Sequence, residues 1–259
     1  MIPAASSDPV TPHTCDPAAL ATGLLGELRA QGDPANVAGM ARYAITAEGT
    51  LGVSMPAVRS LAREAKQRLG SRNAPARHEL ALLLWASGVH EARIMATLVD
   101  APALVDETQA EAWAADLDSW DVCDQLCINL LRLAPMAWHK AVEWTARPEE
   151  YVKRAGFALG AILAVHEKSA PDAAFLPLLA ADEREATDER NMVKKALNWQ
   201  LRSIGKRNPA LNAAAIDTAE RISAAHPDSP AVRWTARGAL RELQSDAVRT
   251  RLGIVPPHS

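Results

Sequence analysis

The sequence is poor in several features on which many folds and activities depend. Of its 259 residues only two are Phe and two are Tyr, although seven are Trp, and its three cysteines form no Cys-x-x-Cys pair. Cys123 and Cys127 lie one helical turn apart, as small core residues do, so we expect neither a disulfide nor a zinc site, and a reducing cytoplasm as the compartment. We also find no run of about 18 uncharged apolar residues and no basic-then-apolar leader, so we expect no membrane span and no secretory signal.

Common catalytic motifs are missing as well. The sequence contains no G-x-x-x-x-G-K-[ST], no H-E-x-x-H and no G-x-S-x-G, and its seven histidines are scattered without the spacing of metal ligands. We therefore expect no cofactor and no bound metal.

The apolar residues that are present favour helices. They are mostly Ala, Leu and Val, and Ala and Leu rank highest in helix propensity. Patterns of helical period, about 10 to 20 residues long, recur between short breaks that combine Pro with Asp, Asn or Ser, which is typical of helix N-termini. No segment alternates with period two. The sequence therefore predicts an all-α fold, a curved solenoid of stacked antiparallel helix pairs of the HEAT-like kind.

The predicted domain organisation is simple. Residues 1–17 are rich in Pro, Ser and Thr, so we expect a disordered N-terminal tail. Residues 18–254 are predicted to form a single helical-repeat domain, and residues 255–259 a short C-terminal tail.

One basic segment stands out in a chain of net charge −3. Residues 190–207, RNMVKKALNWQLRSIGKR, hold six basic residues and no acid. Wound as a helix, the segment places an apolar face opposite a second face that carries Lys195, Trp199, Arg202 and Lys206. A tryptophan within a basic, outward stripe suits a polyanion with flat rings, which is nucleic acid. The alternative is that Trp199 packs under a neighbouring helix and the lysines form a solvated rim.

A carboxylate interrupts an apolar helix in residues 118–131, DSWDVCDQLCINLL. Trp120 and Asp124 lie one turn apart and share a helix face. A carboxylate in such a position either lines a cleft or forms a buried Asp–Arg pair that joins two repeats. Nearby, Lys153 and Arg154 open another apolar helix, where the helix dipole does not favour cations. Their partner is then a phosphate, Asp124, or the glutamates just before them.

The order of these elements resembles the AlkD-type DNA alkylation repair proteins, helical-repeat DNA glycosylases that excise 3- and 7-alkylated purines. The resemblance rests on Trp-x-x-x-Asp (120–124), Lys-Arg-Ala (153–155), Val-Lys-Lys-Ala-x-x-Trp-x-Leu-Arg-x-x-Gly-Lys-x-Asn (193–208), MARYAITAEGTLGVSMPAVRSLAREA (40–65) and ELALLLWASGVHEARIMA (79–96). It covers roughly residues 20–252. Residues 40–56 and 188–208 look closer to a divergent branch of the family.

The resemblance implies a role for each matching residue. Trp120, Asp124 and Trp199 correspond to the catalytic cleft, where two indoles and a carboxylate hold a cationic base. Basic residues would hold the DNA backbone on the concave face. They are Lys153, Arg154, Lys194, Lys195, Arg202 and Lys206. Tyr43 matches the aromatic residue of the first repeats, or is a core residue.

The sequence therefore predicts a monomeric, cytoplasmic DNA repair protein, a monofunctional DNA glycosylase that excises cationic N3- or N7-alkylated purines from double-stranded DNA. Two alternatives remain open, namely a helical-repeat protein that binds DNA or RNA without base excision, and a scaffold for protein partners. Excision requires Trp120, Asp124 and Trp199 to open onto one cleft. A scaffold requires no continuous basic stripe on the concave face.

Overall fold

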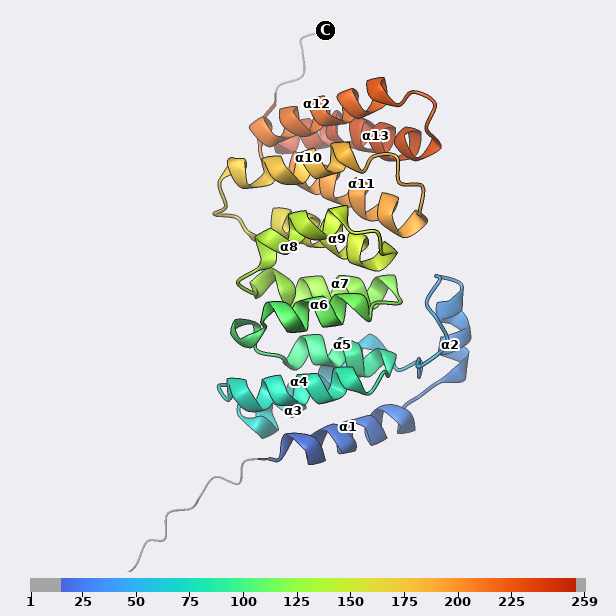
Figure 1. The fold of residues 1–259 in the computed structure, drawn as a ribbon, viewed down its shortest axis with the longest axis vertical. Coiled ribbons are helices and arrows are strands. Elements are labelled where there is room, and N and C mark those ends of the chain that lie inside the picture. Colours follow the sequence, from blue (N-terminus) through green and yellow to red (C-terminus); the bar gives the residue numbers. More distant parts are fainter. Residues whose placement is uncertain (1–14, 255–259) are drawn as a thin grey trace, which may run out of the picture.

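The computed structural model describes residues 15–254, and helices dominate that range (Figure 1). No strand occurs among these residues, which confirms the predicted all-α class. The α-helices are α1 (Pro17–Ala30), α2 (Pro34–Ala41), α3 (Met55–Leu69), α4 (Ala74–Ala86), α5 (His90–Val99), α6 (Glu107–Ala115), α7 (Trp120–Asn129), α8 (Ala137–Glu143), α9 (Glu150–His166), α10 (Leu176–Arg184), α11 (Asn191–Gly205), α12 (Pro209–Ala225), α13 (Pro230–Leu243) and α14 (Asp246–Arg251).

The breaks between helices carry the capping chemistry expected from the sequence. Asp16, Asp33, Asn73 and Asn208 each accept a hydrogen bond from a backbone N–H of the helix that follows, and each of these helices has Pro in its first turn. The first helix already begins at Pro17, so the last residues of the predicted N-terminal tail belong to α1 and its cap. Residues 1–14 and the C-terminal segment 255–259, also predicted to be tails, lie outside the described residues.

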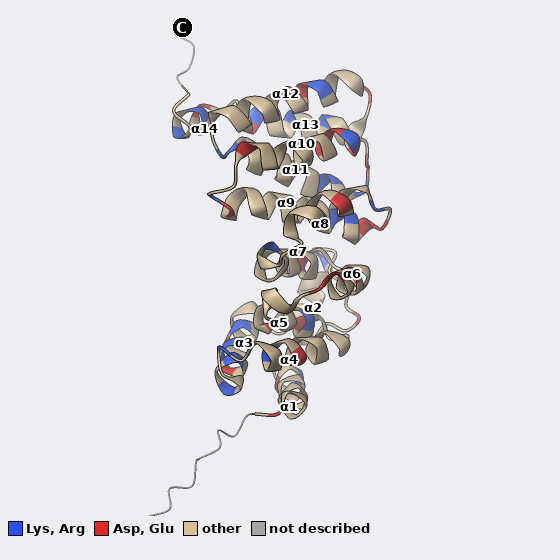
Figure 2. Ribbon diagram, turned by 60° about the vertical axis from the view of Figure 1, so that its left-hand side comes forward, with Lys and Arg blue, Asp and Glu red and all other residues tan. Residues whose placement is uncertain are grey.

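The helices stack in two layers that run the length of the molecule. In Figure 1, α4, α6, α8, α10 and α12 lie in front, and α3, α5, α7, α9, α11 and α13 lie behind them. Within the second layer each helix packs on the next, from α3 through to α13. Figure 2 shows that the stack is bent, with this second layer on its inner side. The predicted curved solenoid is therefore confirmed. We call the exposed side of the second layer the inner surface.

The middle of the stack is the most tightly packed part of the molecule. Helix α9 is buried along almost its whole length and lies against α7, α8 and α11. A Cβ atom at Gly156 would overlap the backbone of Trp144 and Thr145, just after α8, so a glycine there lets α9 lie this close to that segment. The packing of α9 fixes the relative positions of α7 and α11, which carry most of the predicted site residues.

Helix α2 departs from the regular stack and stands beside it in Figure 1. The segment that joins it to α3 is anchored by Glu91, a buried residue of α5, whose carboxylate accepts the backbone N–H groups of Leu51, Gly52 and Val53 at 2.6–3.1 Å. Gly52 has φ +81°, and a Cβ atom there would overlap the carbonyl oxygen of Asp33. This anchoring holds α2 over the N-terminal ends of α5 and α7. None of the helices in residues 15–254 is both long and apolar enough to cross a membrane.

Candidate nucleic-acid interface

Trp120 and Asp124 lie on the first turns of α7, as the sequence predicted. The indole Nε1 of Trp120 donates a hydrogen bond of 2.8 Å to the carbonyl oxygen of Tyr43, which follows α2. Tyr43 itself is 71% exposed, so it is not a core residue. This bond connects α7 to the segment after α2 and holds the indole in one orientation. The indole ring lines the space between α7 and that segment.

Asp124 and Arg154 form a two-armed ion pair between α7 and α9. The guanidinium Nε and Nη2 atoms donate to the two carboxylate oxygens at 3.1 and 2.8 Å, and Nη1 donates to the carbonyl oxygen of Met192 on α11 at 2.9 Å. Burial raises the pKa of Asp124, and the charge of Arg154 opposes that rise. The Asp–Arg pair considered as an alternative is therefore present, while 21% of the Asp124 side chain remains exposed.

A cleft of about 780 Å³ opens between α2, α5 and α7; we call it the α7 cleft. Trp120 and Asp124 line it, together with apolar side chains such as Met40, Ile45 and Ile94. Its acidic residues outnumber its basic ones, because Glu91, Asp121 and Asp124 face only Arg42 and the histidine His90. An apolar, aromatic and acidic lining suits a flat ring that carries positive charge.

Two residues of this cleft form a histidine–carboxylate pair that was not singled out in the sequence. His90 Nε2 lies 2.8 Å from Asp121 Oδ2, and the Ser119 hydroxyl donates to the other oxygen of the same carboxylate. Burial lowers the pKa of His90, but the hydrogen bond and charge of Asp121 outweigh it and raise the pKa overall. His90 is the first residue of α5 and Asp121 lies in the first turn of α7, so the pair joins two helix N-termini. No sequence spacing indicates the pair, because 31 residues separate the partners.

A smaller, basic pocket of about 430 Å³ lies next to the α7 cleft. Trp120 and Tyr43 line both spaces, but here the charged residues are Arg42, Arg154 and Lys195. Lys195 is exposed and lies on the first turns of α11. The indole of Trp120 thus stands between an acidic, apolar cleft and a pocket that suits an anion such as a phosphate.

The structure does not bring Trp199 into the α7 cleft. Trp199 is half-buried, packs against the core, and lines a separate pocket of about 410 Å³ with Val165, Lys206 and Arg207. The reason is its position along the helix. Asp124 meets α9 at its N-terminal end through Arg154, whereas Trp199 lies beside residues at the C-terminal end of α9. The predicted convergence of two indoles and a carboxylate on one cleft is absent.

Several of the predicted DNA-binding residues have partners within the protein. Lys153 is buried and pairs with Glu185 at 2.5 Å and with Asp188 at 3.5 Å, away from the cleft. Arg202 and Lys206 both pair with Glu242 of α13, the latter at 2.6 Å. These three side chains join neighbouring helices, and helical periodicity alone could not reveal that, because their partners lie at least 32 residues away.

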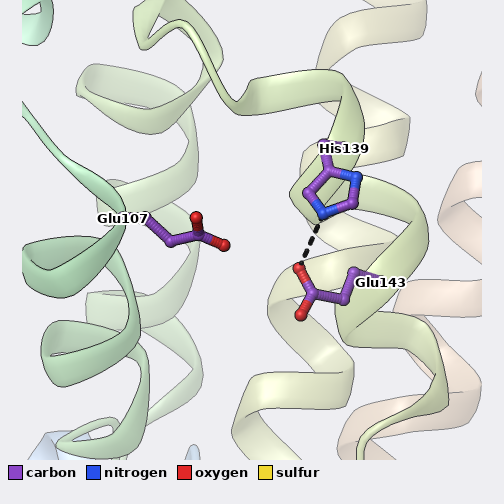
Figure 3. Close-up of side chains that lie close together, drawn as sticks. All are labelled: Glu107, His139 and Glu143. Carbon is purple, nitrogen blue, oxygen red and sulfur yellow. Dashed lines mark ion pairs between the residues drawn. The ribbon is translucent and has the colours of Figure 1, made fainter.

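One group of side chains in residues 15–254 has the spacing of metal ligands, namely Glu107, His139 and Glu143 (Figure 3). The Lys140 ammonium already pairs with the carboxylates of this group, at 2.6 Å from Glu107 and 2.7 Å from Glu143. Lys140 also pairs with Glu111 at 2.6 Å and is only 1% exposed. We therefore interpret the cluster as an ion-pair network that joins α6 to α8, on the layer opposite the α7 cleft.

Two layers of stacked helices, bent around a surface that carries the α7 cleft, define a HEAT-like repeat protein. In agreement, the chain is similar to a solved structure described as "A new family of proteins related to the HEAT-like repeat DNA glycosylases with affinity for branched DNA structures". The TM-score is 0.70 and the identity 18%, over 90% of this chain and 95% of that one. A likeness at this identity shows the fold alone.

The sequence places the chain in one family within this fold. Residues 24–243 match the family model of the DNA alkylation repair enzymes, and the chain belongs to this family. A search of curated proteins gives no match. The family resemblance expected from the ordered motifs is thus confirmed.

Proposed function

We propose that this protein binds DNA on its inner surface and excises purines that alkylation at N3 or N7 has made cationic. Membership of the DNA alkylation repair family supports a role in repair. The observation that carries the proposal is the placement of Trp120 and Asp124, an indole and a carboxylate on one wall of the α7 cleft, beside a basic pocket for the backbone.

The proposed chemistry follows from the charge of the lesion. When the N-glycosidic bond breaks, its electron pair goes to the cationic base, which leaves as a neutral purine, and positive charge develops on the sugar. Asp124 stabilises that charge, and a water molecule then adds to the sugar and releases a proton. Trp120 attracts the cationic base through its ring face. Trp199 lines a separate pocket, so the proposed excision uses one indole in place of the two expected from the sequence. Arg154 acts as a positioning residue, because its two hydrogen bonds orient the Asp124 carboxylate.

The test is release of 7-methylguanine or 3-methyladenine from methylated DNA by the purified protein. Asp124→Asn keeps the shape of the side chain and removes its charge, so we expect the rate to fall by roughly 10- to 1,000-fold while DNA binding persists. Asp118→Asn is the matched control, because Asp118 lies just before the same helix, is half exposed, and does not line the cleft. An equal rate in Asp124→Asn and wild type would remove Asp124 from the mechanism.

Substrate range gives a second readout. The α7 cleft presents carboxylates and one histidine that is bound to Asp121, and a neutral leaving base would require a proton donor aimed at it. We therefore expect uracil and 8-oxoguanine to be left intact.

A second function, DNA binding without base excision, is favoured by two observations. The charge of Asp124 is largely neutralised by Arg154, and Trp199 lines a different pocket. The similar solved structure is described as having affinity for branched DNA, so branched and linear duplexes are the substrates to compare. Salt-dependent DNA binding with no release of any methylated purine would establish this second function over the first.

A further inference from the structure

Helix α13 presents an aromatic and basic surface that lies outside the motifs on which the family resemblance rests. Its exposed side carries Trp234, 47% of which is accessible, and three exposed arginines, Arg233, Arg237 and Arg241. The arginines follow one another at every fourth residue, so they line one stripe of the helix and rise about 6 Å from one to the next.

These arginines have no partner within the described part of the chain. Their guanidinium groups take part in no hydrogen bond and no ion pair there, unlike the guanidinium groups of Arg154 and Arg202. Glu242, the acidic residue that lines the adjacent groove, is already bound to Arg202 and Lys206. The positive charge of the stripe therefore remains available to a ligand.

The stripe borders a groove of about 650 Å³ between α11 and α13, which we call the α13 groove. Its floor is fixed, because the Asn198 side chain of α11 donates a hydrogen bond of 2.8 Å to the Thr235 carbonyl of α13. The Lys194 ammonium lies 5.9 Å from the ring centroid of Trp234 and adds a further positive charge. Helix α13 follows α11 in the inner layer, so the groove continues the surface that carries the basic pocket.

We propose that the α13 groove binds a single-stranded segment of DNA, with one base stacked on Trp234 and phosphates bound by Arg233, Arg237 and Arg241. An exposed indole stacks on a base only where the base is unpaired, and a row of unpaired guanidinium groups follows a phosphate backbone. The rise of about 6 Å between arginines spans one to two nucleotides, given about 3.4 Å per nucleotide of one strand. The proposal rests on the DNA binding proposed above and adds a second, separate contact.

The experiment compares two labelled probes by fluorescence anisotropy at low salt, a blunt duplex and the same duplex with a single-stranded arm of about ten nucleotides. We expect wild type to bind the armed duplex more tightly. Trp234→Ala should weaken binding of the armed duplex about tenfold, and Trp234→Phe should retain most of the affinity because a ring remains. Both variants should bind the blunt duplex almost as wild type does.

The arginines are tested through salt dependence. Replacing Arg233, Arg237 and Arg241 by Ala should reduce the slope of log affinity against log salt by about 2 for the armed duplex, since each phosphate contact on a single strand contributes about 0.7. Arg29→Ala, which removes an exposed charge from α1 at the opposite end of the stack, is the matched control and should leave the slope unchanged. Because all the substituted side chains are exposed, folding is checked by thermal melting and should not change.

Each alternative outcome has a defined meaning. If wild type binds both probes equally, or if Trp234→Ala binds the armed duplex as wild type does, the α13 groove does not bind single strands and the proposal fails while DNA binding stands. Binding of a polyglutamate peptide that is lost in Trp234→Ala, with the armed probe unaffected, would assign the groove to an acidic protein partner and overturn it. If wild type binds neither probe, DNA binding itself fails, and the inference with it.

Discussion

The α7 cleft and the α13 groove contain the same kinds of side chain, but the indole and arginine at the cleft are hydrogen-bonded within the protein and those of α13 at the groove are not, among the described residues. Each has an indole flanked by arginine. Beside the cleft, all three nitrogens of the Arg154 guanidinium donate to Asp124 or to the Met192 carbonyl, and the Trp120 ring edge is bound to the Tyr43 carbonyl. In the groove, Trp234 is exposed and the guanidinium groups beside it have no partner in residues 15–254.

The difference indicates different tasks for the two regions. Internal bonds hold a side chain in one orientation, which is what recognition of one small group requires. Free charges on a surface contribute affinity that falls with salt and is insensitive to base identity. The contrast is in keeping with the proposed functions, recognition of a modified base in the cleft and binding of a strand in the groove.

The largest expected difference between the two regions is in how much the loss of one arginine lowers the free energy of unfolding. Arg154→Ala leaves Asp124 with no cation in a largely buried site, so we expect the free energy of unfolding to fall by about 3 kcal/mol. Arg237→Ala removes an exposed side chain and should change it by less than about 0.5 kcal/mol. Urea denaturation measures both. If Arg154→Ala is as stable as wild type, the ion pair does not hold α7 to α9.

A second buried carboxyl group, that of Asp182 on α10, differs from Asp124 because it has no cation beside it among residues 15–254. One oxygen accepts a hydrogen bond from Gln200, the other has no partner in the described structure, and burial raises its pKa well above the usual value. As pH rises past about 4, the unfolded chain releases this proton before the folded one does, so the folded state loses stability.

Asp182→Asn should therefore stabilise the protein by about 1–3 kcal/mol at pH 8, and the gain should disappear near pH 4, where both states keep the proton. Melting temperatures over this pH range provide the measurement. The matched control is Asp217→Asn on α12, whose side chain is largely exposed. A gain that is the same at every pH would show that titration of Asp182 is not its cause.

The histidine pair of the α7 cleft should give a pH dependence of stability that is smaller and has the same sign, because the pKa of His90 is also raised in the folded state. Because Asp121 raises the pKa of His90 against the effect of burial, protonated His90 stabilises the folded state. That contribution is complete below about pH 6.5 and is lost as pH rises through the raised pKa. His90→Gln should remove about 1 kcal/mol of the difference in stability between pH 6 and pH 8.5. His226→Gln, at an exposed position, should leave the difference unchanged.

The smallest expected effect is on DNA affinity, at Glu242, which binds two basic side chains next to the unpaired arginines of α13. Glu242→Gln removes the carboxylate that binds Arg202 and Lys206 and leaves both cations available to DNA. We expect DNA affinity at low salt to rise about threefold, with a steeper salt dependence. Glu183→Gln removes an exposed carboxylate that binds Arg221 and should not change the affinity. A lower affinity in Glu242→Gln would mean that its ion pairs position the α13 groove.

The fold followed closely from local signals in the sequence. Asp or Asn followed by Pro marks where α1, α2 and α12 begin, and apolar residues of helical period mark the buried faces, so the helices and their number of layers were predictable. The exception is α2, because its position beside the stack depends on Glu91 binding three amides about 40 residues earlier in the chain.

The site was predictable only where it depends on a single helix. Trp120 and Asp124 share a face of α7 because they are one turn apart, and the sequence shows that. The place of Trp199 depends on how far along α9 its own helix packs, and sequence periodicity carries no such information. Trp234 was missed although a signal was present, since the arginines of PAVRWTARGALREL recur at every fourth residue and leave the opposite face apolar.

The regular stacking of the inner layer sets a fixed distance between the α7 cleft and the α13 groove. From α7, which carries Trp120, to α13, which carries Trp234, there are three successive packings, through α9 and α11. With helix axes about 8–10 Å apart, the two indoles sit about 25–30 Å from each other along the stack. That distance corresponds to about eight base pairs of duplex DNA at 3.4 Å each. A DNA molecule that touches both indoles would therefore have its damaged base and its strand opening separated by a length that the number of helices sets.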